Sequence, residues 1–279
     1  VAPYRSNNAT GVTFGNNTFV GISGSGITGR STDNGSSFSY VSSTISKHLY
    51  GVAFGNNTFV VVGNNGRIVR STDNGSSWNS ATSGNTRHFQ GITFGNNTFV
   101  AVGQSGKIVR STDNGSSWDN ATSNTSNLLY GVTFGNNTFV AVGYSGNIVR
   151  SMDNGTNWDN ATSPTGNMLE GVTFGNNTFV AVGSDGKIVR STDNASSWDN
   201  ATSNTSNLLN GVTFGNNTFV GVGNSGNIVR STDNGSNWDN ATDPTSSTIW
   251  EVGFGNNTFV ALVHGGMILR STDNGSNFS

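Results

Sequence analysis

The stretch Ser111-Thr112-Asp113-Asn114-Gly115-Ser116-Ser117-Trp118 recurs along the chain at a fixed spacing of 40 residues. Its seven versions begin at Ser31, Ser71, Ser111, Ser151, Ser191, Ser231 and Ser271. Self-similarity at such a period is typical of repeat architectures, in which each repeat is one supersecondary unit. Seven units of this length account for the 279-residue chain. We therefore expect a single domain over residues 1–279.

Each unit contains four short runs of strand-like composition. In the unit of residues 91–130 they are residues 91–94, 99–102, 107–110 and 118–122. Gly and Asn separate the first three runs, and both tolerate a positive φ in turns. The Asp-Asn-Gly sequence at residues 113–115 predicts a tight hairpin between the third and fourth runs. No run has a helical period.

Four strands per 40 residues predict an all-β, seven-bladed β-propeller with four antiparallel strands in each blade. Apolar residues stand at consecutive positions in the second and third strands, as in sheets that are buried on both faces. A β-solenoid is the alternative, but it usually has shorter coils and distinct caps. Residues 1–10 align with residues 201–210, the tail of a unit, and the last unit stops at Ser279. We expect residues 1–3 to lie beside Ser279, so that the N-terminal segment completes the last blade and closes the ring.

The pattern Ser-x-Asp-x-Gly-x-x-Trp resembles the Asp-box, or BNR repeat, of sialidases and of many non-enzymatic propellers. Departures are mild, since Ala195 replaces the glycine once and Phe38 and Phe278 replace the tryptophan. The resemblance implies a turn between the third and fourth strands with a structural role. The residues to which it assigns this role are Asp33, Asp73, Asp113, Asp153, Asp193, Asp233, Asp273, Trp78, Trp118, Trp158, Trp198 and Trp238.

The chemistry of the box agrees with a structural role. A short carboxylate accepts hydrogen bonds from N–H groups of its own turn, the glycine takes a positive φ, and the Trp ring is buried with an indole N–H that needs a partner. Calcium requires 6–8 oxygen ligands, and one carboxylate per turn supplies too few. We therefore expect no metal and no cofactor.

One arginine precedes every box, at Arg30, Arg70, Arg110, Arg150, Arg190, Arg230 and Arg270. Its recurrence indicates a structural ion pair or hydrogen bond, for which the nearby box aspartate is a candidate. A sialidase uses three arginines at non-equivalent places, with a Tyr/Glu pair, whereas the only glutamates here are Glu170 and Glu251. A glycosidase also needs two facing carboxylates, for which Glu170, Glu251 and Asp185 are the weak candidates. We expect no enzyme.

Composition excludes several other classes of function. Charged residues make up 10% of the chain and the net charge is −2, which argues against nucleic-acid binding. The absence of cysteine excludes disulfides and thiolate metal sites. No run reaches the ~18 apolar residues of a membrane-spanning helix, and residues 1–10 lack a signal-peptide pattern. We expect a monomer without membrane insertion, and a secreted or cell-surface location is slightly favoured over the cytoplasm.

The seven units differ mainly on one predicted face of the disc. Strands alternate in direction, so the turns after strands one and three share one face, and these turns are nearly invariant. The other face carries one variable position before strand one and another in the turn between strands two and three. The candidate ligand-binding residues at these positions are Tyr50, Gln90, Tyr130, Glu170, Asn210, Trp250, Asn64, Gln104, Tyr144, Asn224 and His264.

Three function hypotheses follow. The mixture of aromatics, amides and hydroxyls favours a non-catalytic binding module, such as a multivalent lectin-like propeller with pockets between blades. The second is a structural or assembly scaffold, with near-identical units from recent amplification or engineering. The third is a glycosidase. Expected partners are glycans or another protein.

His48, His88 and His264 have no metal-ligand spacing, although His48 and His88 stand at equivalent places in adjacent units. Neutral variation would also explain the differences between units.

Overall fold

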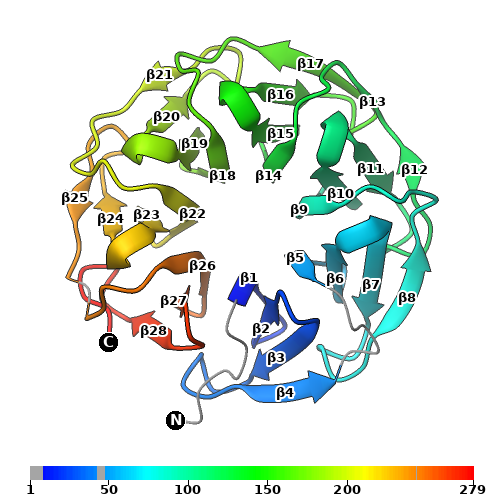
Figure 1. Ribbon diagram of the computed structural model, residues 1–279, viewed down its shortest axis with the longest axis horizontal. Coiled ribbons are helices and arrows are strands. Elements are labelled where there is room, and N and C mark those ends of the chain that lie inside the picture. The colour runs from blue at the N-terminus through cyan, green and yellow to red at the C-terminus, as the bar shows by residue number, and fades with distance from the viewer. Residues whose placement is uncertain (1–8, 43–47, 243) are drawn as a thin grey trace.

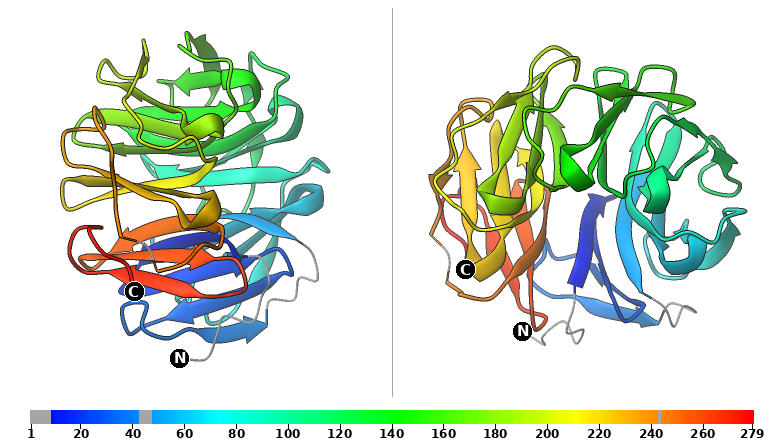
Figure 2. Two further views of the ribbon diagram at one scale, coloured as in Figure 1. Left: turned by 60° about the vertical axis from the view of Figure 1, so that its left-hand side comes forward. Right: turned by 45° about the horizontal axis from the view of Figure 1, so that its top comes forward.

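The computed structural model describes residues 9–42, 48–242 and 244–279. Seven small antiparallel sheets surround a central opening (Figure 1), which confirms the predicted seven-bladed propeller. The turned views in Figure 2 show the blades fanned around the central axis. In every blade the strands follow one another from the centre outward in chain order.

The first strand of each blade is the innermost. These strands are β1 (Ala9–Gly15), β5 (Leu49–Gly55), β9 (Phe89–Gly95), β14 (Leu129–Gly135), β18 (Leu169–Gly175), β22 (Leu209–Gly215) and β26 (Ile249–Gly255). The second strands are β2 (Thr18–Ser23), β6 (Thr58–Gly63), β10 (Thr98–Gly103), β15 (Thr138–Gly143), β19 (Thr178–Gly183), β23 (Thr218–Gly223) and β27 (Thr258–Val263). Every residue of the second strands is buried, as their continuous apolar runs predicted.

The third and fourth strands lie farther out. The third strands are β3 (Ile27–Ser31), β7 (Arg67–Ser71), β11 (Ile108–Ser111), β16 (Ile148–Ser151), β20 (Ile188–Ser191), β24 (Ile228–Ser231) and β28 (Ile268–Ser271). The fourth strands are β4 (Ser39–Ser42), β8 (Asn79–Thr82), β12 (Asp119–Asn120), β17 (Asn157–Ala161), β21 (Asp199–Asn200) and β25 (Asp239–Asn240). A short 3-10 turn joins strands two and three in five blades, as η1 (Asn64–Gly66), η2 (Gln104–Gly106), η3 (Tyr144–Gly146), η4 (Ser184–Gly186) and η5 (Asn224–Gly226).

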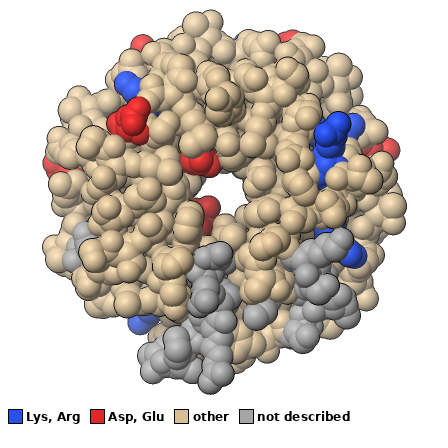
Figure 3. Space-filling model, in the orientation of Figure 1, with Lys and Arg blue, Asp and Glu red and all other residues tan. Residues whose placement is uncertain are grey.

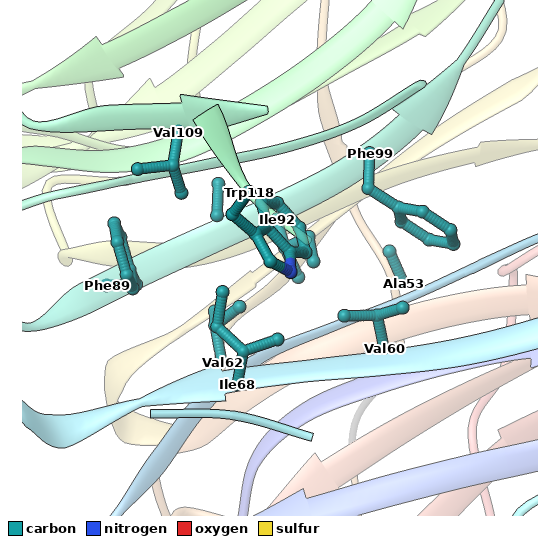
Figure 4. Close-up of a cluster of buried hydrophobic side chains, with 10 residues drawn as sticks. Ala53, Val60, Val62, Ile68, Phe89, Ile92, Phe99, Val109 and Trp118 are labelled. Atoms are coloured by element: carbon teal, nitrogen blue, oxygen red, sulfur yellow. The ribbon is translucent and has the colours of Figure 1, made fainter. Parts of the chain in front are cut away.

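The hydrophobic core lies between neighbouring blades. In Figure 4, Val60 and Ile68 of the second blade face Phe99 and Trp118 of the third. All four are less than 10% exposed. Each blade therefore needs its neighbour to bury its apolar face, which is the general condition for a repeat fold.

The innermost strands also approach one another closely. Gly95 ends β9 against Phe134 of the next blade, and a Cβ added there would lie 2.0 Å from the phenyl ring. Gly255 of the last blade meets Phe14 of the first in the same way, also at 2.0 Å. The ring is thus closed by the same contact that joins the other blades.

Blade seven has three strands among the described residues, β26, β27 and β28. Ser279 and Arg270 exchange two backbone hydrogen bonds of 3.0 and 3.1 Å, which is where a fourth strand would begin. The predicted contact of residues 1–3 with Ser279 lies outside the described residues.

The Asp-box is wider than the tight hairpin that we predicted. Strand β11 ends at Ser111 and β12 begins only at Asp119, so residues 112–118 form the connection. Side chains support this wide turn: Asp113 accepts hydrogen bonds from the Ser111 hydroxyl (2.8 Å) and from the Ser117 hydroxyl (2.6 Å). The indole N–H of Trp118 donates to the Gly115 carbonyl at 3.1 Å.

The box also contacts the preceding blade. Asn154 donates to the Thr98 hydroxyl at 2.7 Å, and Asn96 donates to the Asn154 side-chain oxygen at 3.2 Å. Arg150 of the fourth blade donates to the carbonyl of Asn194 (3.2 Å) in the box of the fifth. The arginine therefore binds the next blade, and the suggestion that it pairs with the aspartate of a nearby box was wrong. Arg270 donates to the Asn34 carbonyl at 3.0 Å and closes the ring in the same way.

A further link joins the outermost strands. Strand β13 (Thr122–Ser123) pairs in parallel with β17 of the next blade, and Thr82, Thr202 and Thr242 make single bridges of the same kind. Repeated contacts at the inner, middle and outer radius thus connect the blades.

Candidate functional site

Seven residues at one repeat position meet at the centre of the ring. The cavity there has a volume of about 360 Å³. We call it the central cavity. Its lining consists of Thr10, Tyr50, Gln90, Tyr130, Glu170, Asn210 and Trp250, together with Leu208 and Glu251.

A β-bulge in each blade brings these side chains to the cavity. In blade four, Leu129 pairs with Gly143 and Gly131 pairs with Val142, which leaves Tyr130 as the extra residue. The same register shift occurs at the second residue of the first strand in the blades of Tyr50, Glu170, Asn210 and Trp250. Bulges re-aim a side chain at the rim of a sheet. These residues therefore lie within the innermost strands, and the prediction that they precede strand one was wrong.

The other variable positions form an outer ring around the cavity. Asn64, Gln104, Tyr144 and Asn224 begin the 3-10 turns, and His264 follows β27. None of them is part of the lining of the central cavity. Figure 1 shows the 3-10 turns on the side of the disc that faces the viewer.

Inner and outer positions of one blade touch each other. The Tyr50 hydroxyl donates to the Asn64 side chain at 2.9 Å. Asn210 reaches Asn224 at 3.4 Å, and the Trp250 and His264 ring centroids lie 6.4 Å apart. The variable residues on this face thus form connected pairs.

A smaller cavity of about 170 Å³ lies beside the central one. Its lining includes His48, Tyr50 and Trp250. The His48 ring is stacked parallel to Tyr50, with centroids 6.3 Å apart, and the His88 Nδ1 atom accepts a hydrogen bond from the Asn65 backbone at 3.0 Å. Both histidines thus approach the region of η1, from adjacent blades.

The central cavity carries two partly buried carboxyl groups. Burial raises the pKa of Glu170 to about 7 and the pKa of Glu251 to about 8. Glu251 accepts one hydrogen bond, from the Val252 backbone at 3.0 Å, which only partly offsets that rise. The carboxylate lies against the neighbouring blade, where a Cβ added to Gly211 would come within 2.4 Å of Glu251 Oε1. Burial, and then the charge of Glu170, also raise the pKa of Tyr130.

Figure 3 shows the same face as a surface, with acidic atoms at the central opening and basic atoms farther out. Arg67 and Lys107 follow the 3-10 turns of blades two and three. Asp185 lies in η4, where it accepts a hydrogen bond from Asn167 at 2.7 Å. Of the three candidate glycosidase carboxylates, Glu170 and Glu251 line the central cavity, whereas Asp185 is not part of its lining.

The sequence named Glu251 only as a glycosidase candidate beside Glu170, and neither Glu251 nor Leu208 was among the predicted ligand-binding residues. A signal for Glu251 existed, because the other six units carry glycine at that position, from Gly11 to Gly211. This signal lies outside the variable loops, because the position belongs to a strand that is otherwise constant among the units. Leu208 stands in a linker and gave no such signal.

No group of three or more His, Asp or Glu side chains that could hold a metal ion is found in the part of the chain that the structure describes. In the same residues, no helix is long and apolar enough to cross a membrane.

Comparison with known families decides the relationship of the chain. The profile of the family described as "Photosynthesis system II assembly factor YCF48" matches residues 31–279. The chain belongs to this family. No curated protein sequence matches it significantly. The Asp-box resemblance alone included both sialidases and non-enzymatic propellers. The family match identifies the chain's relatives more specifically, as a family described by an assembly factor and not as sialidases.

Solved structures similar to this YCF48-family chain share its fold. One is described as YCF48 bound to D1 peptide, with 18% identity, a TM-score of 0.78 and coverage of 97% of this chain and 92% of the other. A second is YCF48 from Cyanidioschyzon merolae, with 16% identity, a TM-score of 0.77 and coverage of 97% and 96%. A third is a catalytically inactive virginiamycin B lyase from Staphylococcus aureus with quinupristin, with 18% identity, a TM-score of 0.83 and coverage of 97% and 96%. Propellers of this shape therefore serve both binding and enzymatic proteins, and the fold alone does not choose between them.

Proposed function

We propose that this protein is a non-catalytic propeller that binds a segment of another polypeptide over the central cavity, as an assembly or scaffold factor does. One observation carries the proposal: the seven members of one highly variable repeat position, with six different residue types, all converge on one cavity. Family membership supports it, as does the similar propeller described as bound to D1 peptide.

The chemistry of the face suits a polypeptide. Trp250, Tyr144 and Met267 are 37%, 55% and 49% exposed, although they are large and apolar. Aromatic side chains dominate the binding energy of protein interfaces, and amides such as Gln90 and Asn210 suit the hydrogen bonds of a peptide backbone. Exposed apolar groups beside placed polar groups are typical of interaction sites.

A multivalent lectin fits this geometry less well. Such a lectin gains avidity from equivalent pockets that recur around the ring. Here the recurring position carries different side chains, and all of them meet in one shared cavity. The aromatic and amide composition that suggested glycans serves a peptide equally well.

Peptide binding tests the proposal directly. We expect the immobilised protein to select members of a library of acetylated and amidated hexapeptides, with a D1 peptide as a further probe. Tyr130→Ala and Trp250→Ala should each reduce the affinity for the selected peptide about tenfold, because each removes an aromatic contact worth about 1 kcal/mol or more. Met152→Thr is the matched control, since Met152 is 62% exposed and follows the first residue of an Asp-box, where all six other units carry threonine. Failure to bind any peptide, or equal losses in the control, would contradict the proposal.

A further inference from the structure

We propose that the central cavity accepts a positively charged group of the bound polypeptide, an ammonium or a guanidinium, beside Glu170 and Glu251. The inference rests on the proposed function and names the class of residue that the bound segment presents. Four observations on the described residues support it.

The first is the distribution of acids. Glu170 and Glu251 are the only glutamates of the chain, and both line this one cavity. They belong to the innermost strands of blades five and seven. Glu251 replaces a glycine that the other six units keep. Two independent departures from the repeat thus add the same chemical group at the same place.

The second is the absence of a charge partner for these acids. Among the described residues that line the cavity there is no Lys, Arg or His. The hydrogen bond that Glu251 accepts comes from the backbone of the next residue in its own strand. Buried carboxylates are normally paired with a cation or with several donors, so an incoming cation would satisfy groups that the fold leaves unpaired.

The third is the aromatic lining. Tyr50, Tyr130 and Trp250 border the same cavity as the two carboxyls. Aromatic rings attract a cation placed over their faces, Trp most strongly. Carboxylates and aromatic rings around one cavity make a recognisable site for a lysine or arginine side chain or for a free amino terminus.

The fourth is the volume. The central cavity, at about 360 Å³, lies within the usual size range of ligand pockets and is ample for one long side chain. The opening at the centre of the disc is visible in Figure 3. A single side chain that enters from the variable face would leave the peptide backbone above the rim, near the exposed ring of Tyr144.

Protonation gives the inference a distinctive signature. Both carboxyls have a raised pKa, so near neutral pH each is partly protonated in the free protein. A cation favours the ionised form, and binding must therefore release protons. Affinity for a lysine or arginine side chain, which stays charged throughout, should rise with pH from about 6 to about 8.5 and then level off. Tyr50 and Tyr130 line the cavity but titrate above this range, since burial raises the pKa of each.

The experiment scans the same hexapeptide library with lysine, arginine, norleucine and aspartate at each position. We expect lysine or arginine at one position to bind at least tenfold more tightly than norleucine, and the affinity for that peptide to increase about tenfold between pH 6 and 8.5. A parallel set with free amino termini and no basic side chain shows whether the cation comes from a side chain or from a chain end. Either source supports the proposed chemistry.

Two variants test the assignment to these acids. Glu251→Gly restores the residue of the other six units, and Glu170→Gln keeps the shape and removes the charge. Each should reduce both the preference for a basic residue and the pH dependence. Asp119→Asn is the control for net charge, because Asp119 is exposed on the outer strand β12.

Three results would overturn the inference while peptide binding itself stands. One is the same affinity for norleucine as for lysine. The second is affinity for the lysine or arginine peptide that falls as pH rises, which indicates a neutral carboxyl donating to the ligand. The third is a pH dependence that is undiminished in both variants, which would assign it to groups other than these two acids, among them His48 and His264 beside Tyr50 and Trp250. If no peptide binds at all, the proposed function fails as well.

Discussion

Residues with a positive φ hold the turns of every blade, and one of them is unusual. The central asparagines of each Gly-Asn-Asn turn and the asparagine of each box adopt such a φ, which asparagine tolerates better than most residues. Ala195 does so as well, with a φ of 62°, where six other boxes have glycine. Its methyl group is completely buried in the cluster that contains Val140 and Trp198.

Replacing Ala195 with glycine should therefore stabilise the protein. We expect Ala195→Gly to raise the free energy of unfolding by about 1 kcal/mol, because the left-handed strain of alanine outweighs the flexibility that glycine adds to the unfolded chain. The reciprocal Gly115→Ala should destabilise by about 1–2 kcal/mol, since it adds both strain and a Cβ 3.0 Å from Val60. Urea denaturation followed by Trp fluorescence measures both. A destabilised Ala195→Gly variant would show that packing of the methyl group dominates.

At the scale of the element, the Asp-box acts on two blades at once. Its carboxylate accepts hydrogen bonds within the turn, and its asparagine bonds the preceding blade. The resemblance to known boxes predicted the first role. It could not predict the second, because the partners Thr98 and Asn154 lie 56 residues apart and become neighbours only when the ring forms.

A double-mutant cycle measures this contact between blades. Thr98→Val removes the acceptor, and Asn154→Gly removes the donor while it tolerates the φ of 61° at that position. We expect each change to destabilise by about 1 kcal/mol and the pair to show a coupling of about 0.5–1 kcal/mol. Thr112→Val is the control in place of Thr98→Val, since Thr112 is exposed in the box of the same blade. Coupling equal to that of the control would mean that the hydrogen bond adds nothing to the association of the blades.

At the scale of the whole molecule, the period of 40 residues was enough to predict the blade number, the strand order and the more variable face. The site was less accessible from the sequence. Tyr130 and Trp250 were recognised as variable, but a one-residue bulge turns them toward the axis, and no spacing in the sequence reveals a bulge. Glu251 was named only as a glycosidase candidate and not as a ligand-binding residue, because it stands in a strand whose other copies are constant.

The pKa values of the box aspartates are lowered and those of the two cavity glutamates are raised, and together they predict how the stability of the whole ring depends on pH. Hydrogen bonds from Ser and Asn side chains and from turn N–H groups lower the pKa of six box aspartates, such as Asp73 and Asp233, to about 2. Because these values lie below the unfolded value of about 4, stability is present above pH 4 and is lost as pH falls toward 2. Each contribution is small, since these carboxylates are exposed, but six act together.

The two glutamates of the central cavity have the opposite sign, so stability should also decline as pH rises. Their pKa values of about 7 and about 8 exceed the unfolded value, and stability is lost between about pH 4.5 and pH 8 as these partly buried carboxyls ionise. We therefore expect a maximum near pH 4–5 and a loss of about 1–3 kcal/mol by pH 9, reduced below the full shift because both side chains keep partial access to solvent. Glu251→Gly should remove at least half of that loss and leave the acidic side of the profile unchanged. Thermal unfolding of both proteins between about pH 2 and pH 9 measures it, and an alkaline decline that the variant retains in full would mean that Glu251 ionises without cost in the folded ring.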